Sequence, residues 1–192
     1  MQARIVRYEV LPFVLYMVVL VASTLLIDAA LHLLNIVWIG RWLGIPGVLL
    51  IIGSFGYSMR KRKLIRSGQP ATLLRWHEAL AWLGSLLVLV HAGVHFNAIL
   101  AWLAVSAMLV NVASGLTGKF LIDRSRRRLE EARQRMRDQG LSADELAERT
   151  YWDSMTFDAV KKWRVIHFPI TLGFGVLGLA HIVATFLFWG WK

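Results

Sequence analysis

Long, continuous apolar runs dominate the sequence and predict membrane-spanning helices. Five such runs can be distinguished, at roughly residues 10–31, 42–59, 73–94, 99–121 and 167–189. Each approaches the ~20 residues that a helix needs to cross the hydrocarbon layer of a bilayer. The runs do not alternate between apolar and polar positions, which argues against a membrane β-barrel. The pattern predicts an all-α integral membrane protein, a bundle of five transmembrane helices forming a single domain over residues 1–192.

The Lys and Arg residues collect between the apolar runs and predict the topology. The chain has 22 cationic and 12 acidic residues, a net charge of +10. Two cations precede the first run, six lie at 60–75 and twelve at 119–164, and Arg41 and Lys192 are the remaining two. Because cations accumulate on the cytoplasmic side, the N-terminus is expected in the cytoplasm and the C-terminus outside. Topology accounts for the charge, so we expect contact with lipid headgroups and no nucleic-acid partner.

A polar segment at about 122–163 predicts a cytoplasmic helical insertion. Residues 123–140, DRSRRRLEEARQRMRDQG, form a charged helical pattern that ends at Gly140, a residue type that commonly follows a helix. Ser142 and Glu145 have the spacing of a capping box at the start of another helix. The segment is too short for a nucleotide-binding domain, and no GxGxxG or P-loop motif is present. A solvated helical hairpin is expected, and a docking surface for a cytoplasmic partner is the alternative.

Two of the apolar runs carry histidines at the same spacing. His77 and His91 lie 14 residues apart in the third run, and His167 and His181 lie 14 apart in the fifth. Fourteen residues make almost four helical turns, so both members of a pair share a face and stand ~21 Å apart along the axis. Both helices run in the same direction across the membrane. If the two faces meet, His77 lies opposite His167 at the cytoplasmic level, and His91 lies opposite His181 at the outer level.

Two imidazoles that face each other in an apolar slot suit a planar macrocycle ligated on both sides, as in b-type haem. Coordination satisfies one nitrogen of each ring, and a backbone carbonyl or hydroxyl can take the other N–H. The chain has no cysteine, which excludes thiolate sites, iron–sulfur clusters and covalent c-type haem. Two histidines per level are too few for a closed zinc site, and a proton relay gives no reason for the repeated spacing. We therefore expect two b-type haems, one held by each pair.

Glycine and arginine residues near the histidines extend this interpretation. Gly84 and Gly178 lie between the histidines of their helices and could leave room for a porphyrin edge, although close helix packing is the alternative. Arg75 and Arg164 stand just before the inner histidines and could pair with haem propionates. Their alternative role is the ordinary flanking charge of a cytoplasmic helix end.

Two further histidines fall outside the pairs. His95 lies one turn beyond His91 and could replace it as a ligand, or contact a propionate or a quinone at the outer surface. His32 lies one turn after Asp28 at the outer end of the first run. A plain interfacial pair is the expected role of these two residues, and proton transfer is the alternative.

The four histidines resemble those of the transmembrane di-haem cytochromes b. The resemblance covers roughly residues 75–183, and the placement on the third and fifth helices is also similar to the ferric reductase membrane domain. It implies a di-haem cytochrome that carries electrons across a bacterial inner membrane, as the membrane subunit of a respiratory oxidoreductase. Implied partners are the quinone pool and iron–sulfur, flavin or multihaem subunits. No catalytic residue is expected. The alternatives are a stand-alone ferric reductase-like or quinol-oxidising enzyme, and a haem-free anchor or transporter.

Overall fold

The computed structural model describes residues 10–93, 99–122 and 151–188, together with a few single positions between 131 and 140. The described residues form helices joined by short turns and loops, without strands. Its helices are α2 (Leu11–Leu33), α3 (Val37–Trp42), α4 (Gly44–Ser54), α5 (Gly56–Lys61), α6 (Pro70–Gly93), α7 (Ile99–Thr117), the π-helix η2 (Gly118–Ile122) and α10 (Tyr151–Phe188). Five segments are long and apolar enough to cross a membrane. The prediction of an all-α, multi-pass membrane protein with five spans is confirmed at this level.

The second span is segmented and begins earlier than the sequence pattern predicted. It runs from Val37 to Lys61 and contains α3, α4 and α5. The junctions at Leu43 and Phe55 keep helical dihedral angles, but their amides bond to the carbonyls of Gly40 and Ile52, three residues earlier. These are single tight 3₁₀-type turns within a nearly continuous helix. The segment Val37–Lys61 is therefore long and apolar enough to cross a membrane as one unit, despite its glycine content.

The fifth span is the membrane part of a much longer helix. Helix α10 has 38 residues, about 57 Å of helix, and its apolar segment is Val165–Phe188. The apolar segment agrees with the expected fifth span at 167–189, and one helix continues from the expected insertion at 122–163 into it. Gly140 has a φ of 79°, as expected for a glycine after a helix. The rest of the expected hairpin, including Ser142 and Glu145, lies outside the described residues.

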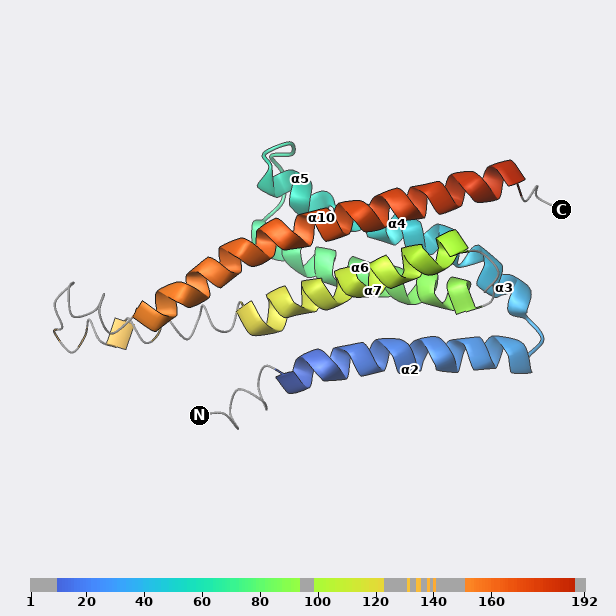
Figure 1. The fold of residues 1–192 in the computed structure, drawn as a ribbon, viewed down its shortest axis with the longest axis horizontal. Helices are drawn as coiled ribbons and strands as arrows, with labels where there is room; N and C mark the ends of the chain where they lie inside the picture. Colours follow the sequence, from blue (N-terminus) through green and yellow to red (C-terminus); the bar gives the residue numbers. More distant parts are fainter. Residues whose placement is uncertain are drawn as a thin grey trace.

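The helices lie side by side along the long axis of the molecule (Figure 1). Helix α4 packs along α6, and α7 packs along α10. Helices α6 and α10 have little or no direct contact with each other. The histidine-bearing helices α6 and α10 therefore belong to two different pairs. Helix α2 begins, and α5 ends, at the same end of the bundle, and α10 ends at the opposite end (Figure 1). We call the first of these the basic end, because the cations at 60–66 lie there.

The core of the bundle is small and its outer faces are apolar. A buried cluster joins α2 to α6 and consists of Leu20, Leu31, Leu86 and Val90. Large apolar side chains point outward elsewhere; Leu26 is 71% exposed and Leu172 is 58% exposed. Such faces are unfavourable in water but suit contact with acyl chains. The fold therefore supports the expected contact with membrane lipid.

Candidate functional site

His91 and His181 face each other near the end opposite the basic end. Their ring centres lie 6.5 Å apart, with the ring planes at 61°. Two imidazoles that hold one metal ion from opposite sides have ring centres about 6.4 Å apart, since each metal–nitrogen bond is about 2 Å. The observed separation fits one ion between the rings. The structure thus brings together the pair that the sequence spacing predicted.

The ring of His91 is held by the second span. Its Nδ1 donates a hydrogen bond of 3.3 Å to the carbonyl oxygen of Gly40. A carbonyl only accepts, so the proton is on Nδ1 and the lone pair is on Nε2. The ring also lies directly over Gly44, where a Cβ atom would come within 3.0 Å of the ring carbons Cγ and Cδ2. Glycine at this position lets the ring approach the backbone of α4.

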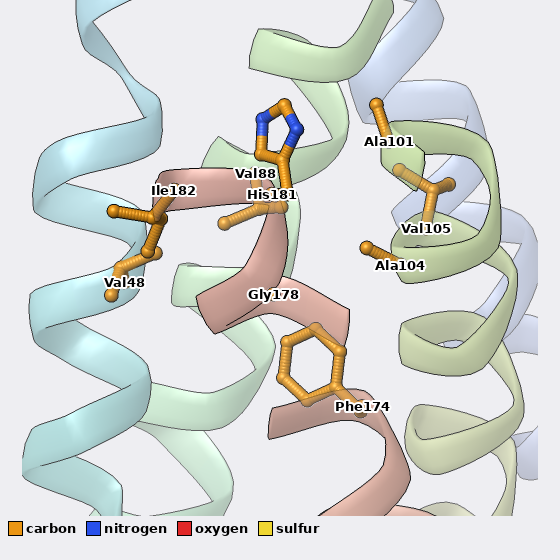
Figure 2. A pocket seen from close by; sticks show the side chains of 9 residues that line it. All are labelled: Val48, Val88, Ala101, Ala104, Val105, Phe174, Gly178, His181 and Ile182. Carbon is orange, nitrogen blue, oxygen red and sulfur yellow. The ribbon is translucent and has the colours of Figure 1, made fainter. Parts of the chain in front are cut away.

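An apolar pocket lies beside His181, between α4, α6, α7 and α10. It is lined by Val48, Val88, Ala101, Ala104, Val105, Phe174, Gly178, His181 and Ile182. Its volume is about 70 Å³, well below the ~300–1,000 Å³ typical of small-molecule and cofactor sites. Figure 2 shows His181 and Phe174 on either side of Gly178 along α10, with the alanines facing them from α7. A Cβ at Gly178 would meet nothing within 4 Å, so the space beside this glycine is open.

His77 and His167, which the sequence spacing pairs, lie toward the basic end, and each is held by a neighbouring helix. The Nδ1 of His77 donates a 2.9 Å hydrogen bond to the carbonyl of Ser54, and the Nδ1 of His167 shares one of 2.9 Å with the hydroxyl of Ser114. Nδ1 of both rings is therefore occupied, as it is in His91, and Nε2 is left for a ligand. The sequence prediction that carbonyl or hydroxyl groups take the second N–H is confirmed for His77, His91 and His167.

A polar seam between α7 and α10 fixes the orientation of His167. The indole of Trp163 stacks on the imidazole at 5.1 Å and 19° and donates a 2.9 Å hydrogen bond to the carbonyl of Ser114. One helical turn beyond His167, the hydroxyl of Thr171 bonds to the amide oxygen of Asn111 at 2.7 Å. Gly118 has no side chain where the Trp163 indole lies. Trp163 therefore packs between α7 and α10, two residues before the apolar segment Val165–Phe188 begins.

The glycines predicted to line the haem differ in their surroundings. Gly178 borders the pocket, as described above. Gly84 is buried against the second span, where an added Cβ would lie 2.8 Å from the carbonyl oxygen of Gly47 and 2.8 Å from Cγ1 of Ile51. The close-packing alternative describes Gly84, because α4 occupies the space that a porphyrin edge would need.

The remaining predicted residues lie at the edges of the site. Arg75 is exposed at the basic end. Arg164 lies on α10, but its side chain is outside the described residues, and so is His95. His32 donates from Nδ1 to the carbonyl of Asp28 at 2.9 Å, and the same nitrogen is 3.7 Å from Oδ1 of that carboxylate. This geometry fits the interfacial pair that the sequence favoured.

Several residues that orient the histidines could not be identified by searching the sequence for metal ligands. Ser54, Ser114, Gly40 and Gly44 each contact a paired histidine, yet none can be a ligand itself. The sequence did contain one relevant feature. Gly40 and Gly44 lie one helical turn apart in the second span, and such glycines allow another helix to approach closely. No group of three or more His, Asp or Glu residues gathers as a metal site in the part of the chain that the structure describes.

Comparison with known proteins supplies no further assignment. No protein family, no curated protein sequence and no solved structure matches this chain. The interpretation of the site therefore depends on its own geometry.

Proposed function

We propose that this chain is a di-haem b-type cytochrome that carries electrons across a membrane. The observation that carries the proposal is that His91 and His181 lie with ring centres 6.5 Å apart, a separation close to that of two imidazoles on one metal ion. The same 14-residue spacing assigns His77 and His167 to the other level. Iron coordination explains why four imidazoles are tolerated in membrane helices, where ionisable groups are costly. The proposal also explains why both pairs repeat the same 14-residue spacing.

The chain contributes axial ligands and the environment of each site. His77 and His167 would hold one haem, and His91 and His181 the other, each through Nε2. Hydrogen bonds at Nδ1 fix the tautomer and the ring orientation, and such outer contacts raise ligand basicity. The pocket beside His181 gives this side of the site an apolar lining. When bound, the two haems supply one-electron redox chemistry at two depths of the membrane.

The spacing of the sites supports transfer across the bilayer. The two histidines of each helix are ~21 Å apart along its axis, a large part of the ~30 Å hydrocarbon thickness. We propose that the chain works in a bacterial inner membrane as a subunit of a respiratory oxidoreductase. Its partners would be the quinone pool and a subunit that carries iron–sulfur, flavin or multihaem centres.

Haem content of single histidine variants tests the proposal. His77→Ala, His91→Ala, His167→Ala and His181→Ala should each retain about one haem per chain, against two in the unchanged protein. His32→Ala is the matched control, since this histidine bonds only within α2, and it should retain both haems. Full haem content in all four ligand variants would refute the assignment. Retention of both haems in His91→Ala but not in His95→Ala would move the outer ligand to His95.

The subunit role has a separate test. Mild solubilisation from native membranes should yield the chain together with soluble redox subunits. A purified chain that oxidises quinol and reduces ferric chelates without any other subunit would instead favour the stand-alone reductase.

A further inference from the structure

The loop between α5 and α6 carries a dense, exposed group of cations. Residues 60–66 include Arg60, Lys61, Arg62, Lys63 and Arg66, and no Asp or Glu occurs between residues 55 and 77. Arg62, Lys63 and Arg66 are exposed. The nearest acidic residue along the chain, Glu78, already pairs with Lys119 at 2.7 Å. The positive charge of the loop is therefore not balanced by acids within the loop.

The backbone of this loop is ordered in a costly conformation. Lys63 has a φ of 61°, and the amides of Lys63 and Leu64 bond to the carbonyls of Arg60 and Met59. This is a Schellman ending, in which the left-handed position is usually glycine because a Cβ is unfavourable there. The Nε of Arg60 donates a 3.2 Å hydrogen bond to the carbonyl of Gly68 and closes the loop. Charge that only flanks a membrane span does not require a left-handed residue. The presence of lysine rather than glycine at this position therefore indicates a further role for its side chain.

The loop also reaches α10. The guanidinium of Arg62 lies over the ring of Phe168, 4.8 Å from the ring centre. Phe168 is half exposed, and Val165 and Leu172, one turn to either side, are also exposed. Cationic groups and an outward apolar strip of α10 are thereby adjacent. A ligand with an anionic head and an apolar tail matches both parts.

The depth of the loop fits the headgroup layer of a membrane. The span Val37–Lys61 ends at the loop, and the span Pro70–Gly93 begins just after it. The apolar segment Val165–Phe188 begins three residues before the Phe168 contact. Phosphate groups of lipids lie at this boundary, and basic residues beside it attract anionic lipids.

We propose that this loop binds the phosphate of an anionic phospholipid, whose acyl chain lies along α10. Arg62 and Lys63 contact the phosphate, while Val165, Phe168 and Leu172 contact the chain. Because Arg62 bridges the α4–α6 pair and α10, the lipid would hold together the two helix pairs that carry the histidines. The site itself does not require haem.

A lipid titration tests this site. The full-length protein in neutral detergent is titrated with phosphatidylglycerol, phosphatidylcholine or inorganic phosphate, and thermal unfolding is followed. Phosphatidylglycerol should raise the unfolding temperature, and the other two should not. An equal rise with phosphatidylcholine would remove the requirement for an anionic head. An equal rise with inorganic phosphate would show a free-anion site and overturn the lipid assignment.

Variants locate the effect. The double variant Arg62→Gln/Lys63→Gln should need about thirtyfold more phosphatidylglycerol for the same rise, about fivefold for each lost cation. Arg127→Gln/Arg128→Gln removes the same charge from the insertion and should behave as the unchanged protein. Equal weakening in this control would show a non-specific charge effect and overturn the site.

Lys63→Gly provides a variant that should fold at least as well, because glycine suits the left-handed position. It should need about fivefold more phosphatidylglycerol than the unchanged protein. An unaltered lipid response in Lys63→Gly would exclude the lysine from the site and contradict the proposal.

Discussion

Replacement of Gly44 by alanine tests whether the second span positions His91. The added Cβ would lie 3.0 Å from Cγ and Cδ2 of the His91 ring and 3.1 Å from Nε2. Ordinary carbon contacts are about 3.5–4.0 Å, so the ring must move by about half an ångström. Gly44 begins α4 after a helical Leu43, and alanine favours helix. The substitution therefore acts chiefly through the ring.

The displacement is large compared with what the site can absorb. The hydrogen bond from His91 Nδ1 to Gly40 is already long, at 3.3 Å, and beyond about 3.5 Å it is effectively lost. A ligand needs to be held within about 0.5 Å of its working position. Loss of such an orienting contact weakens metal binding about 10- to 100-fold, or about 1.4–2.7 kcal/mol. We expect Gly44→Ala to weaken haem binding by this factor at the outer site alone.

Haem titration of the depleted protein measures this effect. Gly53→Ala is the matched control, because its Cβ would meet only a methyl of Leu80, at an ordinary 3.7 Å. The control should bind two haems with unchanged affinity, whereas Gly44→Ala should show one tight and one weakened site. Equal binding curves for the two variants would refute the claim that Gly44 allows the His91 ring its position.

Three further predictions concern the inner ligand, the pocket and the topology. Ser114→Ala removes the hydrogen bond to His167 and should weaken the inner haem about tenfold or more; Ser106→Ala, an exposed position on the same helix, should not change the haem titration. Gly178→Leu places a side chain in the pocket beside His181 and should reduce haem content from two to one per chain. Gly173→Leu, at an exposed position, should retain both haems, and equal retention by both variants would show that the pocket is not a haem site. Reporter fusions should place the N-terminus in the cytoplasm and the C-terminus outside, and the opposite result would overturn the charge argument.

The helices and the shared histidine faces could be predicted from sequence because both follow from simple periodicity. Apolar length alone specifies a spanning helix, and 14 residues at 100° each place two side chains on one face. The structure confirms the spans and brings His91 opposite His181 at 6.5 Å. The hydrogen bonds at Nδ1 were predictable in kind, because a histidine ligand needs a partner for its second nitrogen.

The identity of those partners was not predictable, since it depends on how separate helices pack. Ser54 meets α6 only because α4 lies along it, and Gly40 meets His91 only because α3 contacts α6. Ser114 meets His167 only because α7 lies along α10. The role of Gly84 was unpredictable for the same reason. Its position on the face of α6 near His77 was compatible with lining a haem or with contacting α4. The length of α10 was also missed, since charged residues at 151–164 do not reveal whether a helix ends before the membrane begins.

A reduced-minus-oxidised absorption spectrum of the purified protein, with a haem-to-protein ratio, tests the central proposal most directly. A di-haem b-type cytochrome should show a b-type α-band and two haems per chain. A correctly folded protein whose spectrum shows no haem would contradict it.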